Sequence, residues 1–315
     1  MRSKPALIGR ILHFFIDRPC PPAVFQLSSS FVSGIQVAVK ERKIKNAAIL
    51  SLPPGLVQPH FDRKNVTDPA SLAAVMKEAL RKLHVSGKWA ACLLPESCLK
   101  VFVLQFDSLP ASPAERENLV RWKVKKQMPV IPDDTRLSYE VISSARPVKV
   151  VLALARKAVI EEYEALFAGV GLKVGAASVP TLSLLNLVDS EKDGDLLVAN
   201  IEDDSLSLAA VTQSELALYR HKALGGDRTA GIPGDQSVEN IVKEIENTIH
   251  FIEDREKREI RSLWLRTGMR ERAANVVAEL GERFSGAIRM VDPLPLASLS
   301  PEERSILAPL FGQII

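Results

Sequence analysis

The chain has 315 residues, about two domains' worth at a typical size of about 150, and 46% of its residues are apolar, enough for sizeable cores. Lys and Arg number 41 against 38 Asp and Glu, so the net charge of +3 gives no strong field for nucleic acid or acidic lipid. Uninterrupted apolar runs such as Trp89 to Leu94 hold six residues, against the roughly 20 that span a bilayer. These features predict a globular protein without a transmembrane helix.

Cysteine and histidine spacing predicts no metal site and no disulfide framework. Cys20, Cys92 and Cys98 are too few to pair fully and have no metal-ligand spacing, which is typical of a reduced, cytosolic chain. The five histidines show neither HxxxH nor HxH spacing. The start of the chain has the basic residues Arg2 and Lys4, but charges interrupt the apolar stretch after them, which argues against a signal peptide.

The opening stretch from Pro5 to Asp17 has apolar residues at helical spacing and predicts a short amphipathic helix. Such a helix can dock on its own domain or lie at a membrane interface. The small number of basic residues favours docking, and membrane contact stays open.

The following chain begins with three short β-type runs and a helix that Asp68 and Pro69 start and Gly87 ends. Further strands and helices follow, and the first half is predicted to contain the following elements: strands 23–27, 34–40, 46–52, 89–94, 101–109, 137–143, 148–155 and 172–179, the helix from Pro69 that Gly87 ends, and helices 113–127, 159–169 and 181–188.

The second half repeats this order after a polar link at 190–195. Its predicted elements are strands 196–201, 205–211, 215–221, 262–267 and 288–291, and helices 237–257, 271–284 and one from Pro301, with a Gly/Asp-rich loop at 225–235. We therefore expect an N-terminal extension (1–20), a first lobe (21–190) with an inserted α/β subdomain at about 97–173, and a second lobe (191–315).

Several strings in these elements resemble the PilM family of type IV pilus assembly proteins. The most specific lies in the inserted subdomain, where an Arg121-Trp122 helix is followed by a proline-punctuated link and a strand containing Tyr139. The other matching strings are Leu52 to Val57 with Asp68, Leu109-Pro110, Val151 to Arg156, Glu161 to Tyr163, Gly169 to Leu172, and Gly225 to Asp227. The resemblance covers most of the chain from about Ala23 and implies an α/β, two-lobed, actin-like (ribonuclease-H-like) fold shared with FtsA and the cytoplasmic domain of GspL.

Members of this fold hold Mg-ATP between the lobes, on hairpins that supply an acid for the metal and glycines for the phosphates. The first hairpin here has Gln26 in place of the acid, Ser28 in place of the glycine and Ser33 in place of the base, around Ser29 and Ser30. The second has Asn200 in place of the acid, and Glu202 in place of the glycine puts negative charge where phosphate would sit. The adenosine-binding turn is reduced to Thr267-Gly268-Met269.

These departures predict a pseudo-ATPase with no catalytic residues, no bound metal and no required cofactor. Residual nucleotide binding through Ser29, Ser30, Gly225 and Gly226 stays open. The Ser28 to Ser33 run is then an ordinary polar hairpin, and Asp203 and Asp204 are an exposed turn rather than a metal site.

The resemblance implies a cytoplasmic adaptor at the inner-membrane face that binds the N-terminal tail of a PilN-type membrane protein and contacts other pilus platform or motor proteins. The tail is expected in a groove between the first lobe and the inserted subdomain, with Val101, Val103, Arg121 and Trp122 as candidate contacts, although a helical tryptophan is more often a core residue. Without further stacking residues, the basic helix at 121–126 favours a solvated or partner-facing surface over nucleic acid. An active ATPase with diverged motifs and a GspL-like secretion subunit without a membrane span remain alternatives.

Overall fold

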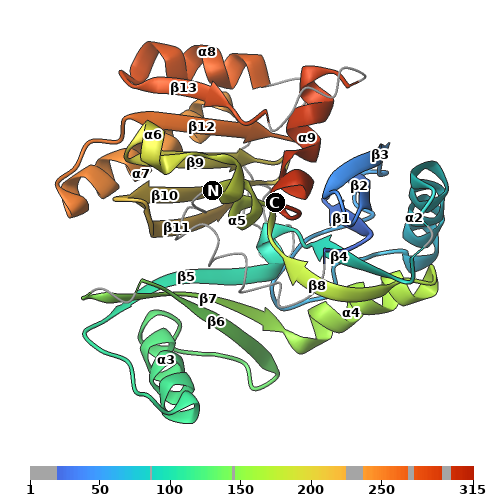
Figure 1. Ribbon diagram of the computed structural model, residues 1–315, viewed down its shortest axis with the longest axis horizontal. Helices are drawn as coiled ribbons and strands as arrows, with labels where there is room; N and C mark the ends of the chain where they lie inside the picture. The colour runs from blue at the N-terminus through green and yellow to red at the C-terminus, as the bar shows by residue number, and fades with distance from the viewer. Residues whose placement is uncertain (1–19, 86, 144–145, 225–236, 269–272, 293–298) are drawn as a thin grey trace.

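The computed structural model describes residues 20–85, 87–143, 146–224, 237–268, 273–292 and 299–315. Two five-stranded sheets of the same plan form its body (Figure 1). The first sheet has the order β3 (Lys43–Ser51), β2 (Phe31–Ala38), β1 (Ala23–Leu27), β4 (Trp89–Leu93) and β8 (Lys173–Ser178). The second has the order β11 (Glu215–Ala223), β10 (Ser205–Thr212), β9 (Leu196–Ile201), β12 (Ser262–Thr267) and β13 (Ala287–Met290). We call the parts built on these sheets the first and the second lobe.

Each sheet joins an antiparallel meander of three strands to two parallel strands. In the first sheet β1 pairs antiparallel with β2 and parallel with β4, and in the second β9 pairs antiparallel with β10 and parallel with β12. The central strands are buried on both faces because helices cover each sheet. The predicted α/β fold with duplicated halves is confirmed.

Capping residues set both ends of the first helix of the first lobe. α2 (Pro69–Leu83) begins at Asp68, whose carboxylate accepts hydrogen bonds from the backbone N–H groups of Ala70 and Ser71. The expected end at Gly87 is wrong, because His84 adopts the left-handed conformation (φ 52°) and ends the helix three residues earlier. α4 (Lys157–Gly169) packs beside α2 and against β8, and α5 (Pro180–Leu184) follows β8.

The helices of the second lobe are α6 (Ser190–Asp193), α7 (Val238–Glu256), α8 (Ala273–Arg283) and α9 (Pro301–Gly312). α6 is a single turn inside the stretch expected to be an irregular link. α7 and α8 pack together, and α7 buries its apolar stripe against the second sheet. α9 crosses between the lobes, because Leu307, Leu310 and Phe311 pack against residues of β1 and β2. The expected N-terminal helix and the loop at 225–235 lie outside the described residues.

The inserted subdomain consists of a three-stranded antiparallel sheet and one helix. Its strands are β5 (Leu99–Phe106), β7 (Val148–Arg156) and β6 (Thr135–Ser143), in that order, and its helix is α3 (Pro113–Gln127). β5 begins at Leu99 and ends at Phe106, before the expected Leu109, because its pairing with β7 runs from Leu99 opposite Ala155 to Phe106 opposite Val148. One face of this sheet packs on α3, and the strand β11 of the second lobe lies along β5 (Figure 1).

Candidate functional site

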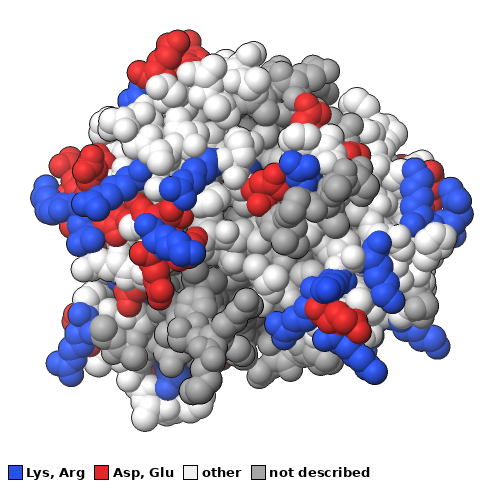
Figure 2. Space-filling view, turned by 45° about the horizontal axis from the view of Figure 1, so that its top comes forward, with Lys and Arg blue, Asp and Glu red and all other residues white. Residues whose placement is uncertain are grey.

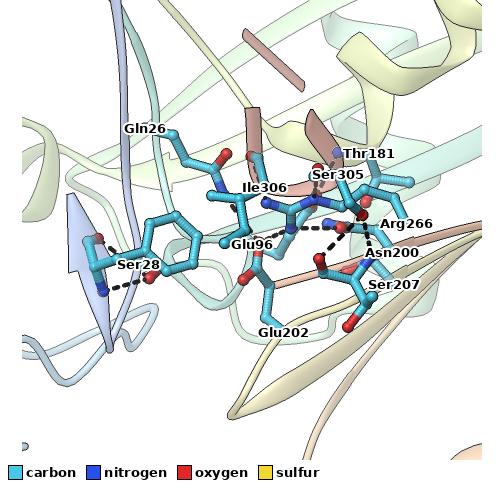
Figure 3. Close-up of polar contacts among 12 residues, drawn as sticks. Gln26, Ser28, Glu96, Thr181, Asn200, Glu202, Ser207, Arg266, Ser305 and Ile306 are labelled. Carbon is cyan, nitrogen blue, oxygen red and sulfur yellow. Dashed lines mark hydrogen bonds and ion pairs between the residues drawn. The ribbon is translucent and has the colours of Figure 1, made fainter. Parts of the chain in front are cut away.

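The two lobes meet at the ends of their central strands, where the degenerate nucleotide motifs lie. Gln26 is the fourth residue of β1, Asn200 stands near the end of β9, and Glu202 follows β9 directly. All three side chains are buried. Gln26 Nε2 donates a hydrogen bond of 2.9 Å to Glu202 Oε1, which joins the first lobe to the second (Figure 3).

Arg266 of β12 lies at the centre of this junction and is fully buried. Its register partner on β9 is Asn200, so both side chains leave the same face of the second sheet. The guanidinium Nη1 forms an ion pair with Glu202 and donates to Asn200 Oδ1 over 2.9 Å. Burial raises the pKa of the Glu202 carboxyl, and the charge of Arg266 and its hydrogen bond oppose that rise.

The remaining guanidinium atoms of Arg266 bind the backbone of α9. Nε donates to the carbonyl oxygen of Ser305 over 2.9 Å, and Nη2 donates to that of Ile306 over 2.8 Å (Figure 3). The hydroxyl of Ser305 donates to the carbonyl of Thr267 and accepts from its N–H. Protein acceptors therefore bind the nitrogens of Arg266 on three sides. A phosphate could bind this guanidinium only by displacing some of these hydrogen bonds.

The turn of the first hairpin is closed by its own serine. Ser28 Oγ accepts hydrogen bonds from the N–H groups of Ser30 (3.2 Å) and Phe31 (3.0 Å). Backbone N–H groups in such a turn are the groups that would cradle a phosphate. The expected polar hairpin is present, with Gln26 opposite Ser33 across the strands, but Ser28 and Ser33 are buried rather than solvated.

Gly268 makes room for Glu202. A Cβ atom on Gly268 would lie 2.3 Å from Glu202 Oε2, far inside the contact distance of the two atoms. Among the described residues, a cavity of about 10 Å³ lies at the junction, lined among others by Gln26, Ser28 and Glu202, which is about the volume that one water molecule needs. The space beside Gly268 is occupied by the carboxylate of Glu202.

A second buried carboxylate, Glu96, lines the same cavity from the first lobe. Its Oε1 accepts from the N–H of Thr181 over 2.7 Å, and its Oε2 accepts from the hydroxyl of Tyr219 in β11. Burial raises the pKa of Glu96, and these hydrogen bonds partly offset the rise. Asp204 also faces the cavity, and it is half-buried rather than exposed; burial raises its pKa against hydrogen bonds from Ser29 and Ser205.

The four candidate partner contacts lie on two sides of the inserted sheet. Val101 and Val103 are half-buried and pack toward the body of the protein, on the side where β11 meets β5. Arg121 and Trp122 belong to α3, which packs on the other face through Val120 and Val124. The four residues therefore do not form one surface.

Trp122 is 53% exposed, so the expectation of a core tryptophan is wrong. The ammonium group of Lys126 lies over the Trp122 ring, 3.8 Å from the ring centre. Arg121, in contrast, forms an ion pair with Glu117. The helix buries Val120 and Val124 instead, and that choice of face turns Trp122 outward.

Sequence reasoning missed Arg266, Glu96 and Ser305. Arg266 is the single charged residue in the mostly apolar strand 262–267. Because an unpaired charge is rarely buried, this position could have indicated a buried ion pair. Its partners could not be identified, since they stand 39 or more positions away along the chain. Gly225 and Gly226 lie outside the described residues.

Within the described ranges no helix is long and apolar enough to cross a membrane. In the same part of the chain no group of three or more His, Cys, Asp or Glu side chains could hold a metal ion.

Comparisons with known proteins identify the fold. No family model matches the sequence, and no curated protein matches it. Among solved structures, a chain described as part of a PilM–PilN type IV pilus biogenesis complex is similar with a TM-score of 0.73 and 18% identity, over 94% of this chain and 97% of that one. A Bacteroides thetaiotaomicron protein of unknown function with an actin-like ATPase fold has a TM-score of 0.53 and 10% identity, over 93% of this chain and 98% of that one. The actin-like fold is therefore shown.

Proposed function

We propose that this chain is a cytoplasmic adaptor of type IV pilus assembly, which binds the N-terminal tail of a PilN-type inner-membrane protein and does not hydrolyse ATP. The inference that the chain does not hydrolyse ATP rests on the Arg266–Glu202 ion pair, which lies between the lobes and is bound on both sides by protein groups. The first half rests on the similarity to the PilM–PilN structure over nearly the whole chain and on the strings that resemble PilM.

The groups between the lobes do not fit Mg-ATP. A metal-bound nucleotide needs carboxylates that hold the cation and free N–H groups that face the phosphates. Amides stand at positions 26 and 200, the N–H groups of Ser30 and Phe31 are bound to Ser28, and the cavity that the described residues Gln26, Ser28 and Glu202 line is about 10 Å³. Entry of a triphosphate would require Arg266 to release Glu202 and would bring that carboxylate against phosphate oxygens. We therefore derive no chemical step for this site.

A solvent-exposed aromatic residue supports the partner role. An exposed tryptophan on a short helix offers a large apolar area with little conformational entropy to lose, which is typical of residues that anchor a bound peptide. Val130, in the link after α3, is 79% exposed and adds apolar surface to the same subdomain. We infer that the partner tail contacts the α3 side of the inserted subdomain, with Trp122 as the main contact.

Calorimetry on the full chain tests both halves of the proposal. A synthetic peptide with the sequence of a PilN-type N-terminal tail should bind, and its affinity should be the same with and without Mg-ATP. Mg-ATP alone should give no heat of binding and no thermal stabilisation, whereas a ligand at a hundred times its Kd would stabilise by about 2.7 kcal/mol. Micromolar binding of Mg-ATP would contradict the inference that the junction does not fit this nucleotide, and absence of peptide binding would contradict the adaptor.

A pair of matched variants tests the contact surface. Trp122→Ala should weaken peptide binding at least tenfold, in the range of an interface anchor of about 2 kcal/mol. Phe251→Ala is the control, because Phe251 is equally exposed (52%) and also lies under a cation, Arg255, but belongs to the second lobe. Equal losses from both substitutions would place the peptide elsewhere.

A further inference from the structure

The end of the first lobe that points away from the polar junction is strongly basic. β1 runs from this end to the junction, so the two are separated by about 15 Å, the length of a five-residue strand. Two segments form it: the turn between β2 and β3 with its flanks (residues 39–45) and the end of α2 with the link to β4 (residues 81–88). We call these two segments the basic end.

Backbone and side-chain contacts hold the two segments together. Gln36 Nε2 donates to the carbonyl of His84 over 2.9 Å, and Asn46 Nδ2 donates to that of Leu83 over 3.3 Å, so α2 ends beside the strands that lead into the turn. Gly87 packs on Pro22, which binds β2 through its carbonyl. The basic end is therefore one continuous surface.

The charge of this surface is far from that of the whole chain. Its 15 residues contain seven basic residues and one acid, Glu41, and Lys82 pairs with Glu78 one turn earlier in α2, so the local charge is +5 against +3 for all 315 residues. All seven basic side chains are exposed: Lys40, Arg42, Lys43, Lys45, Arg81, Lys82 and Lys88. In Figure 2, blue predominates over red on the right-hand side of the molecule, which carries β2, β3 and α2 in Figure 1, whereas blue and red are mixed about evenly on the left. The net charge of the whole chain does not reveal that basic residues are concentrated at this end.

One further feature indicates what the surface meets. Val39, directly after β2, is an exposed apolar residue (40%) among these charges. Basic side chains beside an apolar one are the combination that binds anionic bilayers, because each signal alone is weak.

We propose that the basic end binds the surface of a bilayer that contains anionic phospholipid, with the cations on the head groups and the exposed side chain of Val39 at the interface. A nucleic acid fits less well, since neither segment contains a Phe, Tyr or Trp on which a base could stack. This contact is independent of the tail-binding partner. It would orient the first lobe with the junction facing away from the membrane.

Vesicle sedimentation with the full chain tests the proposal. The protein should sediment with vesicles of 30% phosphatidylglycerol and 70% phosphatidylcholine at 50 mM salt, and not with pure phosphatidylcholine. Binding should fall several-fold at 300 mM salt because the contact is electrostatic. Substituting Lys40, Lys43 and Lys45 together by Gln should weaken binding by about five-fold per charge, the fold-change that corresponds to about 1 kcal/mol for a basic residue near an anionic surface.

A control with the same change of net charge separates the surface from the total charge. Substituting Lys64, Lys125 and Lys243 by Gln also removes three exposed cations, none of them in the basic end. This control should bind vesicles like the unmodified chain. Equal weakening by both triple substitutions, equal sedimentation with neutral vesicles, or no sedimentation would overturn the proposal. Binding to a single-stranded oligonucleotide without binding to vesicles would assign the surface to nucleic acid instead.

Discussion

The ion pair between Arg266 and Glu202 makes a sharp prediction about stability. Substituting Arg266→Met removes the cation of the pair and keeps much of the side-chain volume, so Glu202 remains as a buried carboxylate without its cation. Breaking a buried pair from one side typically costs about 3–5 kcal/mol. The substitution also removes donors from the carbonyls of Ser305 and Ile306, which adds to the loss. We expect a decrease of at least about 3 kcal/mol in the free energy of unfolding.

A second substitution distinguishes an ion pair from simple packing. Glu202→Gln alone leaves Arg266 buried without a carboxylate and should also destabilise by about 3 kcal/mol. The two substitutions together remove both charges, so the double variant should lose much less than the sum of the singles. We expect a coupling free energy of at least about 2 kcal/mol, within the range for residues in one buried network.

Guanidinium denaturation followed by tryptophan fluorescence measures these free energies, since Trp264 stands two residues before Arg266 on β12. Arg121→Met is the matched control: its partner Glu117 is also a carboxylate, but both side chains are more than 40% exposed, and the loss should stay below about 1 kcal/mol. A loss at Arg266 no larger than at Arg121, or additive single effects within about 0.5 kcal/mol, would refute the inference that this pair holds the junction.

Three further substitutions test the surroundings of the pair. Gly268→Ala should destabilise by about 1–3 kcal/mol, because the new methyl group meets the Glu202 carboxylate; the thermal midpoint measures it, and an unchanged midpoint would contradict the close approach. Ser28→Ala should speed amide hydrogen exchange at Phe31, which loses its acceptor, and exchange at the original rate would show that the turn does not depend on that hydroxyl. Burial raises the folded-state pKa of Glu96 above its ordinary value of 4.5, so this group's contribution to stability is complete below that value and is lost as the pH rises through the folded pKa. Glu96→Gln should therefore flatten this decline in denaturation curves recorded from acidic to neutral pH, and an unchanged pH profile would contradict the shift.

The elements of the fold could be predicted from local patterns. β1, β9, β12 and α3 have the predicted bounds, because continuous apolar runs and a Pro after a capping serine mark them without reference to the rest of the chain. Errors fall where tertiary pairing decides, as at the end of β5, which stops where its partner β7 begins. The left-handed His84 is another such case, since few sequence signals place a non-glycine residue in that conformation.

The sequence predicted only which residues of the family's nucleotide-binding pattern are missing from the site. Single positions revealed that acids and glycines are missing, because a family pattern exists for each of them. What replaced them depends on Arg266, whose partners come from β9, the residue after β9, and α9. Burial of an arginine is decided by the groups that surround it in space, and those are not encoded in neighbouring positions. Likewise, exposure of Trp122 depends on which face of α3 the inserted sheet covers.

The replacements form one balanced change rather than scattered decay. Amides at positions 26 and 200 remove the charges that would hold a cation, and the charge that Glu202 introduces is matched by Arg266. The resulting network ties β1 of the first lobe to the second lobe through Gln26, and Arg266 ties β12 to α9, which itself packs on the first sheet. Side chains of the two lobes thus fix one lobe against the other. A partner surface on such a body is preorganised, so less entropy is lost on binding, and its affinity should not respond to nucleotide at all.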